Sequence, residues 1–216
     1  MTKSKFDEDY FERGRVKGIS GYMNYTWMPE LTIRMAYYMI SKLPIFEDQK
    51  VLDFGCAKGF LVRAFRILDI ECYGVDISDY AIKHTDTEVK NYCWKTEGCS
   101  DEIIFKKEYD WMIAKDVFEH IPEYELRKLL TGAKQSIKKI FAVIPLGIDD
   151  NSDKFIIPDY HNDVTHITIK DIKWWIKLFT SCGWIAEKAE KNFSGVKENW
   201  TDIWPEGNAF FVLSRK

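Results

Sequence analysis

The sequence lacks long apolar runs, and no stretch of about 18 apolar residues is available for a membrane-spanning helix. The first residues, MTKSKFDEDYFERG, also lack the apolar segment of a signal peptide. The sequence also lacks an excess of positive charge, since its net charge is −3. Nucleic-acid binders usually have a positive net charge, because phosphate contacts dominate their affinity. We therefore expect a cytoplasmic protein with no membrane or nucleic-acid partner.

Paired cysteines are also lacking. The five cysteines are odd in number and show no CxxC spacing, so disulfides and structural zinc are disfavoured and a reducing compartment is favoured. They are Cys56, Cys72, Cys93, Cys99 and Cys182. What the chain does have is 216 residues, 46% of them hydrophobic, which predicts a single domain with a sizeable core.

Short apolar runs alternate with longer amphipathic segments along most of the chain. Strands are predicted at 50–54, 71–77, 109–116, 139–145, 184–192 and 208–216, with a weak strand at 89–94. Helices are predicted from Pro29 to Pro44, at 59–68, at 78–85 behind an N-cap at Ser78, at 123–136, and from 168 or 170 to 181. Residues 1–28, rich in Tyr, Gly and charge, are predicted to form an irregular arm.

This alternation predicts an α/β fold with helices on both faces of a mostly parallel sheet. The last two strands follow one another with no predicted helix between them, which favours antiparallel pairing. We therefore expect a Rossmann-like, mostly parallel seven-stranded sheet with a reversed last strand. Residues 1–47 would form an arm and helix on the acceptor side, and residues 48–216 the main domain.

The strongest local signal is VLDFGCAKGF at 51–60. A buried strand ends at Asp53, a turn with Gly55, Ala57 and Gly59 follows, and a helix begins. Small residues let the backbone approach a ligand closely, and the helix N-terminus offers free N–H groups. Ligands of such sheets dock outside the carboxyl ends of the strands.

The second strand ends in Gly-Val-Asp76-Ile77. An acidic residue there, about 20 residues after the glycine loop, typically binds ribose hydroxyls. A nicotinamide enzyme would share these features, but its GxGxxG loop cradles a pyrophosphate at the end of the strand. Asp53 would repel a pyrophosphate, whereas it suits the cationic amino-acid part of S-adenosylmethionine.

With these motifs the sequence resembles the class I S-adenosylmethionine-dependent methyltransferases. DFGCAKG looks like the first motif of that family, with Ala57 at the middle glycine, and AKDVFEHIP at 114–122 looks like its fourth-strand motif. The resemblance implies S-adenosylmethionine as cofactor. The residues that it implies for the cofactor are Asp53, Gly55, Ala57, Gly59, Asp76, Ile77, Lys115, Asp116 and Val117. The adenine-side residue after the third strand does not match clearly and lies among 93–99.

A narrower likeness concerns the arm YFERGRVKGISGYMNYTW, the segment IPLG and the run DVTHITIKDIKWWIKLF. These resemble small bacterial methyltransferases found with surface-polysaccharide biosynthesis enzymes. The acceptor implied is a small or sugar-linked molecule.

Transfer to an oxygen needs a base for the acceptor proton, and histidine suits because its ordinary pKa is near 6.5. We expect His166, His120 or Asp163 to act there, without deciding between them, and His161 to contact the acceptor. Aromatic residues of the arm, Tyr22, Tyr25 and Trp27, could face the sulfonium or the acceptor.

Several alternatives stay open: N-methylation of a small amine, a non-catalytic cofactor-binding partner of a larger complex, and a nicotinamide oxidoreductase. No metal is expected, because Asp149 and Asp150, which could accompany Asp116 at a Mg²⁺ site, are better explained as a solvated turn. The oligomeric state is not predicted.

Overall fold

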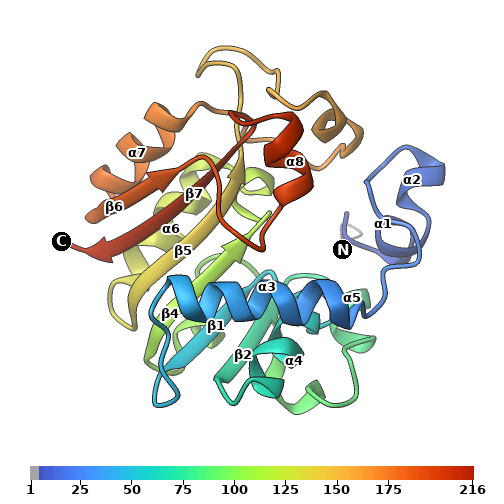
Figure 1. The fold of residues 1–216 in the computed structure, drawn as a ribbon, viewed down its shortest axis with the longest axis vertical. Helices are drawn as coiled ribbons and strands as arrows, with labels where there is room; N and C mark the ends of the chain where they lie inside the picture. Colours follow the sequence, from blue (N-terminus) through green and yellow to red (C-terminus); the bar gives the residue numbers. More distant parts are fainter. Residues whose placement is uncertain (1–4) are drawn as a thin grey trace.

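The computed structural model describes residues 5–216, and their seven strands form one sheet (Figure 1). The strands are β1 (Lys50–Phe54), β2 (Glu71–Asp76), β3 (Cys93–Lys95), β4 (Tyr109–Lys115), β5 (Ile137–Pro145), β6 (Trp184–Glu190) and β7 (Asn208–Arg215). The helices are α1 (Glu8–Glu12), α2 (Gly14–Lys17), α3 (Pro29–Lys42), α4 (Phe60–Ile67), α5 (Asp79–Lys83), α6 (Glu123–Ala133), α7 (Ile172–Ser181) and α8 (Glu198–Ile203). Short 3-10 turns are η1 (Lys90–Tyr92), η2 (Glu102–Phe105), η3 (Phe118–His120) and η4 (Pro158–Asn162).

The strand order is β3-β2-β1-β4-β5-β7-β6, with the first five strands parallel and β7 antiparallel to both of its neighbours. The sequence-based prediction of a mostly parallel sheet with a reversed last strand is thus confirmed. The order reverses direction between β1 and β4, so their carboxyl ends diverge into a crevice where such sheets bind ligands.

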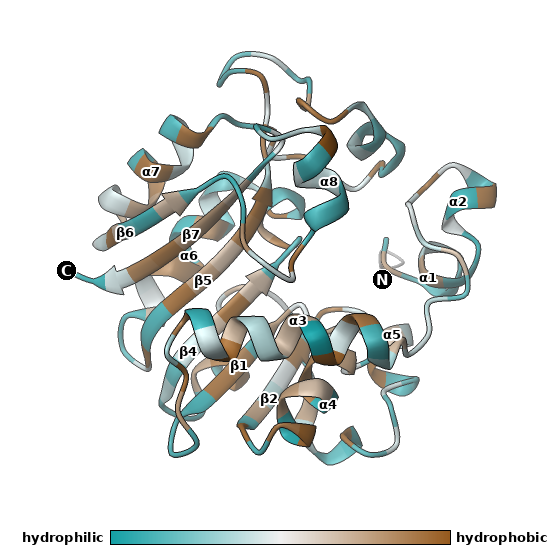
Figure 2. Cartoon of the chain, viewed as in Figure 1, coloured by the Kyte–Doolittle hydropathy of each residue, from teal (hydrophilic) through white to brown (hydrophobic). Residues whose placement is uncertain are grey.

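Helices cover both faces of the sheet. On one face, α3 and α4 bury Ala36, Met39 and Phe65 in a shared core, and on the other α6 and α7 bury Leu129 and Trp175. β5 and β7, both interior strands of the sheet, are largely hydrophobic in Figure 2, as expected for strands buried on both sides. None of the helices within residues 5–216 is long and apolar enough to cross a membrane.

Most predicted elements are found within a few residues of their expected bounds, and Ser78 caps α5 by accepting the Ala81 N–H at 2.9 Å. Three predictions were wrong. The third strand spans only Cys93–Lys95, because η1 occupies half of the predicted stretch. The short helix α8 interrupts the last two strands, and the arm contains α1 and α2.

The arm packs across the carboxyl end of the sheet rather than along a core helix (Figure 1). Asp7 caps α1 by accepting the Tyr10 N–H at 3.2 Å, and Gly18, with φ of 63°, ends α2 in the left-handed conformation. The predicted division at residue 47 stays a prediction, although α3 packs against α4 in the core of the main domain.

Candidate active site

The loop after β1 is drawn tightly toward β2 and β4. The N–H groups of Gly55 and Cys56 both donate to Val75 O, at 2.8 and 3.0 Å. Gly55 has φ of 83°, and a Cβ there would lie 2.4 Å from Val117 Cγ2. Glycine is therefore required at position 55 both by its backbone conformation and by the loop that follows β4.

Asp76, at the end of β2, is the residue that organises this loop. One carboxylate oxygen accepts the Ala57 N–H at 2.8 Å and the other accepts the Ser78 N–H at 2.8 Å. Burial nevertheless raises its pKa, because the carboxylate is almost fully removed from water. The carboxylate is fixed in place with lone pairs left for a ligand.

A first cavity of about 420 Å³ opens at these strand ends. Its lining includes Gly55, Ala57, Asp76, Ile77, Asp116 and Val117 from the predicted cofactor set. The segment 96–99 lines it as well, which narrows the adenine-side candidates to the loop after β3.

Three predicted cofactor residues lie behind this lining instead of in it. Gly59, with φ of 77°, begins α4, and a Cβ there would meet the Cys93 sulfur at 2.9 Å. Asp53 is 4% exposed at the end of β1, where burial and the nearby Asp76 raise its pKa to about 7. The Lys115 Nζ forms an ion pair with Asp116 Oδ2 at 2.5 Å.

Asp116 stands where the first cavity meets a second one, in a left-handed conformation with φ of 56°. Its carboxylate pairs with Lys115 and with Lys197, whose side chain is only 8% exposed. Although burial acts in the opposite direction, the two ammonium groups lower the pKa of Asp116. Lys197 also donates to Tyr160 Oη at 2.7 Å and to Asn208 Oδ1 at 3.1 Å.

The second cavity, of about 620 Å³, shares Tyr10, Tyr22, Asp116 and His120 with the first. Its other lining residues come from the arm, η3, the segment 159–166 and α8. Two predicted catalytic residues, Asp163 and His166, lie there together with His120. The structure thus brings together all three predicted catalytic side chains, although their roles remain predictions.

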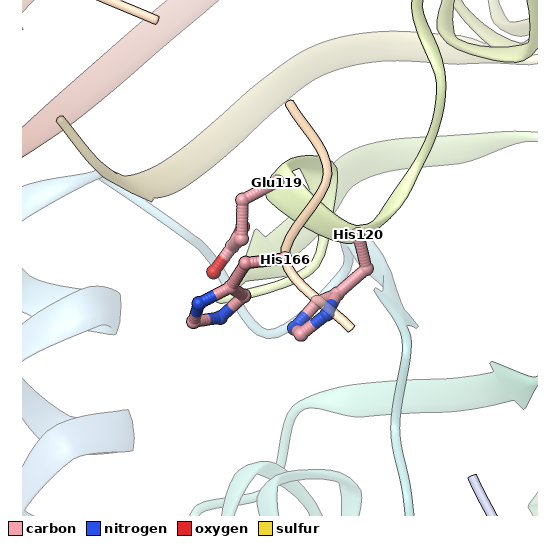
Figure 3. A group of neighbouring side chains, drawn as sticks. All are labelled: Glu119, His120 and His166. Atoms are coloured by element: carbon pink, nitrogen blue, oxygen red, sulfur yellow. The ribbon is translucent and has the colours of Figure 1, made fainter. Parts of the chain in front are cut away.

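The segment 163–168 is fastened to η3 through its backbone. Glu119 O accepts the N–H groups of Ile167 and Thr168, both at 2.9 Å, and Thr168 Oγ1 donates to Ile121 O at 2.7 Å. This brings the His166 ring to 4.6 Å from the His120 ring, between their centroids. Figure 3 shows the Glu119 carboxyl beside the two rings.

Burial shifts the pKa values of His120, His166 and Glu119 toward their neutral forms. It lowers the pKa of His166, and together with the neighbouring His166 it lowers the pKa of His120 to about 4. Burial and the Asp116 charge raise the pKa of Glu119 well above its ordinary value. Both imidazoles are therefore neutral at pH 7.

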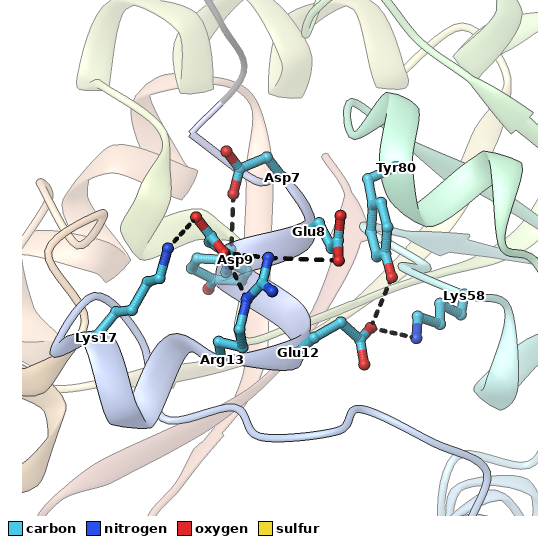
Figure 4. Close-up of polar contacts among 9 residues, drawn as sticks. Asp7, Glu8, Asp9, Glu12, Arg13, Lys17, Lys58 and Tyr80 are labelled. Carbon is cyan, nitrogen blue, oxygen red and sulfur yellow. Dashed lines mark hydrogen bonds and ion pairs between the residues drawn. The ribbon is translucent and has the colours of Figure 1, made fainter.

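Hydrogen bonds hold the arm over the cavities (Figure 4). Lys58 Nζ pairs with Glu12 at 2.6 Å and donates to Tyr25 O at 2.8 Å, and Tyr80 Oη donates to Glu12 at 3.1 Å. On the other side, Tyr10 Oη donates to Asp163 at 2.7 Å. The arm therefore joins the loop after β1, through Lys58, to the segment that carries His166.

The predicted acceptor residues are separated by the structure. Tyr22, 37% exposed, lines both cavities. Tyr25 packs against Phe60, and Trp27 lies under the Arg63 guanidinium at 4.8 Å from its ring centroid, and neither is part of the cavity linings. His161 is exposed and accepts the Phe155 N–H at 3.0 Å, also outside both linings.

Comparison with known proteins agrees with this geometry. A family described as a methyltransferase domain matches residues 23–181. The chain belongs to this methyltransferase family. S-adenosylmethionine is the methyl donor that this membership implies, and the cofactor expected from the sequence is thus supported.

Solved methyltransferases share the fold of this methyltransferase at low sequence identity. A S-adenosylmethionine-dependent methyltransferase from Archaeoglobus fulgidus superposes with a TM-score of 0.64 at 18% identity, over 87% of this chain and 95% of that chain. The methyltransferase solved with the Haloferax volcanii Trm112 activator gives 0.63 at 15% identity, over 87% and 91%. The glycopeptide N-methyltransferase MtfA, in complex with S-adenosylmethionine, gives 0.61 at 11% identity, over 86% and 94%. No curated protein sequence matches the chain.

Sequence reasoning missed the buried polar residues that surround Asp116. Lys197, Tyr160 and Asn208 belong to three segments that meet only in the fold, and Glu119 entered the sequence analysis only within the motif AKDVFEHIP. Phe6 was missed as well, although its ring lies 5.5 Å from His120. The one available signal was local: Lys197 follows Gly195 just before α8, in the stretch between the last two predicted strands, where no element was predicted.

Proposed function

We propose that this methyltransferase transfers a methyl group to a hydroxyl of a small or sugar-linked acceptor bound in the second cavity. The observation that supports this most is the junction of the two cavities at Asp116 and His120. One cavity carries the cofactor motifs, and the other carries neutral histidines that could take a proton. Methyl transfer is an in-line displacement, so holding donor and acceptor on either side of one opening supplies much of the catalysis.

The first cavity fits S-adenosylmethionine, which supplies a methyl group on a positively charged sulfur. Asp76 would accept hydrogen bonds from the ribose, with Ile77 and the segment 96–99 beside the adenine. The backbone of Gly55 and Ala57 leaves room for the methionine part, since a Cβ at position 55 would already collide with Val117.

The arm would exclude water from the junction, because Phe6, Tyr10 and Phe11 line the first cavity and are joined to both sides of the site. In the second cavity, His166 Nδ1 bonds to Tyr160 O at 2.7 Å, which leaves Nε2 free for the acceptor proton. His120 is placed similarly through its Nδ1 bond to Thr165 at 2.8 Å.

A second candidate is N-methylation of a small amine. It is favoured by the carboxylates of Asp159 and Asp163 around the second cavity, which would attract a cationic substrate. An amine must lose its proton before it reacts, but it needs no strong base during transfer.

The test is a methyl-transfer screen with labelled S-adenosylmethionine over hydroxyl and amine acceptors, after binding of S-adenosylhomocysteine and NAD has been compared by calorimetry. Tight binding of S-adenosylhomocysteine without NAD binding is expected. Removal of both histidine rings should abolish transfer to a hydroxyl and affect an amine much less. Failure of every acceptor, with cofactor bound, would favour a non-catalytic partner protein.

The cofactor cavity itself can be tested with a pair of glycine variants. Gly55→Ala and Gly18→Ala both place a side chain at positive φ, but position 18 has no atom within 4 Å of the new Cβ. Gly55→Ala should lose S-adenosylhomocysteine affinity, whereas Gly18→Ala should keep it. Equal affinities in the two variants would contradict the proposed cofactor cavity.

A further inference from the structure

Glu119, His120 and His166 each offer one ligand atom, and these atoms lie within 4.8 Å of one another (Figure 3). Within this group, the Glu119 side chain gives the strongest evidence for a bound ligand. Glu119 is 1% exposed, and neither of its carboxyl oxygens has a hydrogen-bond partner among residues 5–216. An unpartnered buried carboxyl group is costly and rare, and a bound ion is one of the arrangements that would satisfy it.

The two histidines are oriented as metal ligands usually are. His166 Nδ1 lies 2.7 Å from Tyr160 O, which can only accept, so Nδ1 carries the proton and Nε2 has a free lone pair. Thr165 Oγ1 donates to Asp163 Oδ1 at 2.5 Å, so at 2.8 Å it accepts from His120 Nδ1. His120 Nε2 is therefore free too.

These outer contacts match those around bound metals. Ligating histidines commonly donate the other ring N–H to a carbonyl or, directly or through a neighbour, to a carboxylate. His166 has the carbonyl of Tyr160, and His120 reaches the Asp163 carboxylate through Thr165. His84 makes a similar Nδ1 contact to Tyr80 O at 2.8 Å, but it is exposed and belongs to no group of three potential metal ligands among residues 5–216.

We propose that Glu119, His120 and His166 bind a divalent transition-metal ion in the second cavity. Two imidazole nitrogens and one carboxylate suit Zn²⁺, Mn²⁺ or Fe²⁺ better than Ca²⁺, which prefers oxygen ligands. Three protein ligands leave coordination positions open, as in catalytic metal sites. This departs from the sequence-based expectation of no metal, which considered only Asp116 with the exposed turn at Asp149 and Asp150.

The metal would determine the chemical class of the methyl acceptor. This inference rests on the proposed function. An acceptor hydroxyl would occupy an open position, and the cation would lower its pKa. With the metal bound, both Nε2 lone pairs are used for coordination, so the metal would replace the histidines as the group that promotes deprotonation, and the proton would pass to water in the cavity. The acceptor class is therefore an alcohol that can place its oxygen on the cation, not an amine that merely fills an acidic cavity.

The experiment is a titration of untagged, chelator-treated protein with Mn²⁺, followed by the loss of the free-ion signal in electron paramagnetic resonance. One bound ion per chain is expected. Glu119→Gln and His166→Ala should each weaken binding by at least about tenfold, while His84→Ala should bind as the parent does. A parent protein that leaves the free-ion signal unchanged would overturn the proposal, as would equal binding by all variants.

Folding of each variant is checked by thermal unfolding and by S-adenosylhomocysteine binding, which do not need the metal. Thr165→Val provides a further test, because it keeps the shape of the side chain and removes the partner of His120. It should weaken Mn²⁺ binding by roughly 10–100-fold. Unchanged Mn²⁺ affinity in folded Thr165→Val would contradict the assigned orientation of His120.

The two proposals can fail separately. Mn²⁺ binding without methyl transfer to any acceptor would leave the metal site and remove the proposed function. Methyl transfer to an alcohol at the same rate in chelator-treated and Mn²⁺-loaded protein would leave the proposed function and overturn the role of the metal.

Discussion

The two cavities of the site share four side chains but are assembled in different ways. The first is lined mainly by residues that directly follow β1, β2, β3 and β4, so each lies within a few residues of a strand end. The second is lined by loops and turns from Tyr10 to Trp200. A parallel sheet places its strand ends together whatever the loops are, whereas the second cavity exists only if distant segments pack correctly.

The difference extends to charge. In the first cavity the carboxylate of Asp76 is satisfied by backbone N–H groups of its own neighbourhood. In the second, Asp116 depends on Lys197, which is 81 residues away in the chain, and Glu119 has no partner within residues 5–216. Under the proposed function, cofactor binding would therefore depend on local structure, and acceptor chemistry on long-range contacts.

The largest expected effect is that variants of the two cavities change different quantities, the transfer rate in one case and the cofactor affinity in the other. His166→Ala should lower the rate of methyl transfer to an alcohol by about 10²–10⁴, because it removes a proton acceptor or a metal ligand. Its affinity for S-adenosylhomocysteine should remain that of the parent. Asp76→Asn should do the opposite and weaken cofactor affinity by about 10–100-fold, the usual value of a hydrogen bond to a charged group. A large affinity loss in His166→Ala, measured by calorimetry, would mean that the cavities are not separable.

The next effect concerns the buried ion pair that joins the cavities. Lys197→Met should lower the free energy of unfolding by about 3 kcal/mol, since the Asp116 carboxylate, whose side chain is only 22% exposed, loses one of its two ammonium partners. Lys138→Met is the matched control, because Lys138 pairs with Asp110 at 2.7 Å on the surface, and it should cost less than about 1 kcal/mol. Denaturant unfolding measures both, and equal losses would refute the special role of Lys197.

A smaller effect should appear as a pH dependence of stability. The pKa of Asp53 is about 7 in the folded chain and near 3.8 when unfolded, so between these values the folded state holds the extra proton. Asp53 thus stabilises the fold at low pH, and this contribution is lost as pH rises to 7. From pH 5 to 8, the parent should lose about 2–3 kcal/mol more than Asp53→Asn. Parallel stability curves for the two proteins would contradict the raised pKa.

The smallest effect tests the arm that spans both cavities. Tyr10→Phe removes only the hydroxyl that donates to Asp163 at 2.7 Å, and it should cost about 1 kcal/mol of unfolding free energy. We expect the Michaelis constant for the acceptor to rise, while cofactor affinity stays the same because Phe keeps the ring. A rise in cofactor dissociation constant instead would place the arm with the first cavity alone.

The sheet, its reversed strand and most of the first cavity could be predicted from local features of the amino-acid sequence. Hydrophobic runs mark buried strands, and small residues and carboxylates at their ends reflect backbone requirements that act over a few positions, as at Gly55 and Asp76. The prediction erred where local signals are weak, at β3 and α8, whose short elements depend on what packs against them.

Which of the candidate side chains share a cavity depends on long-range packing and could be seen only in the three-dimensional structure. His120 and His166 meet because the carbonyl of Glu119 binds two N–H groups of a loop more than 40 residues later, while Trp27 and His161 are turned elsewhere. Hydrogen bonds between distant segments leave no periodic trace in the sequence, so neither the buried carboxyl of Glu119 nor the partner of Asp116 could be read from it.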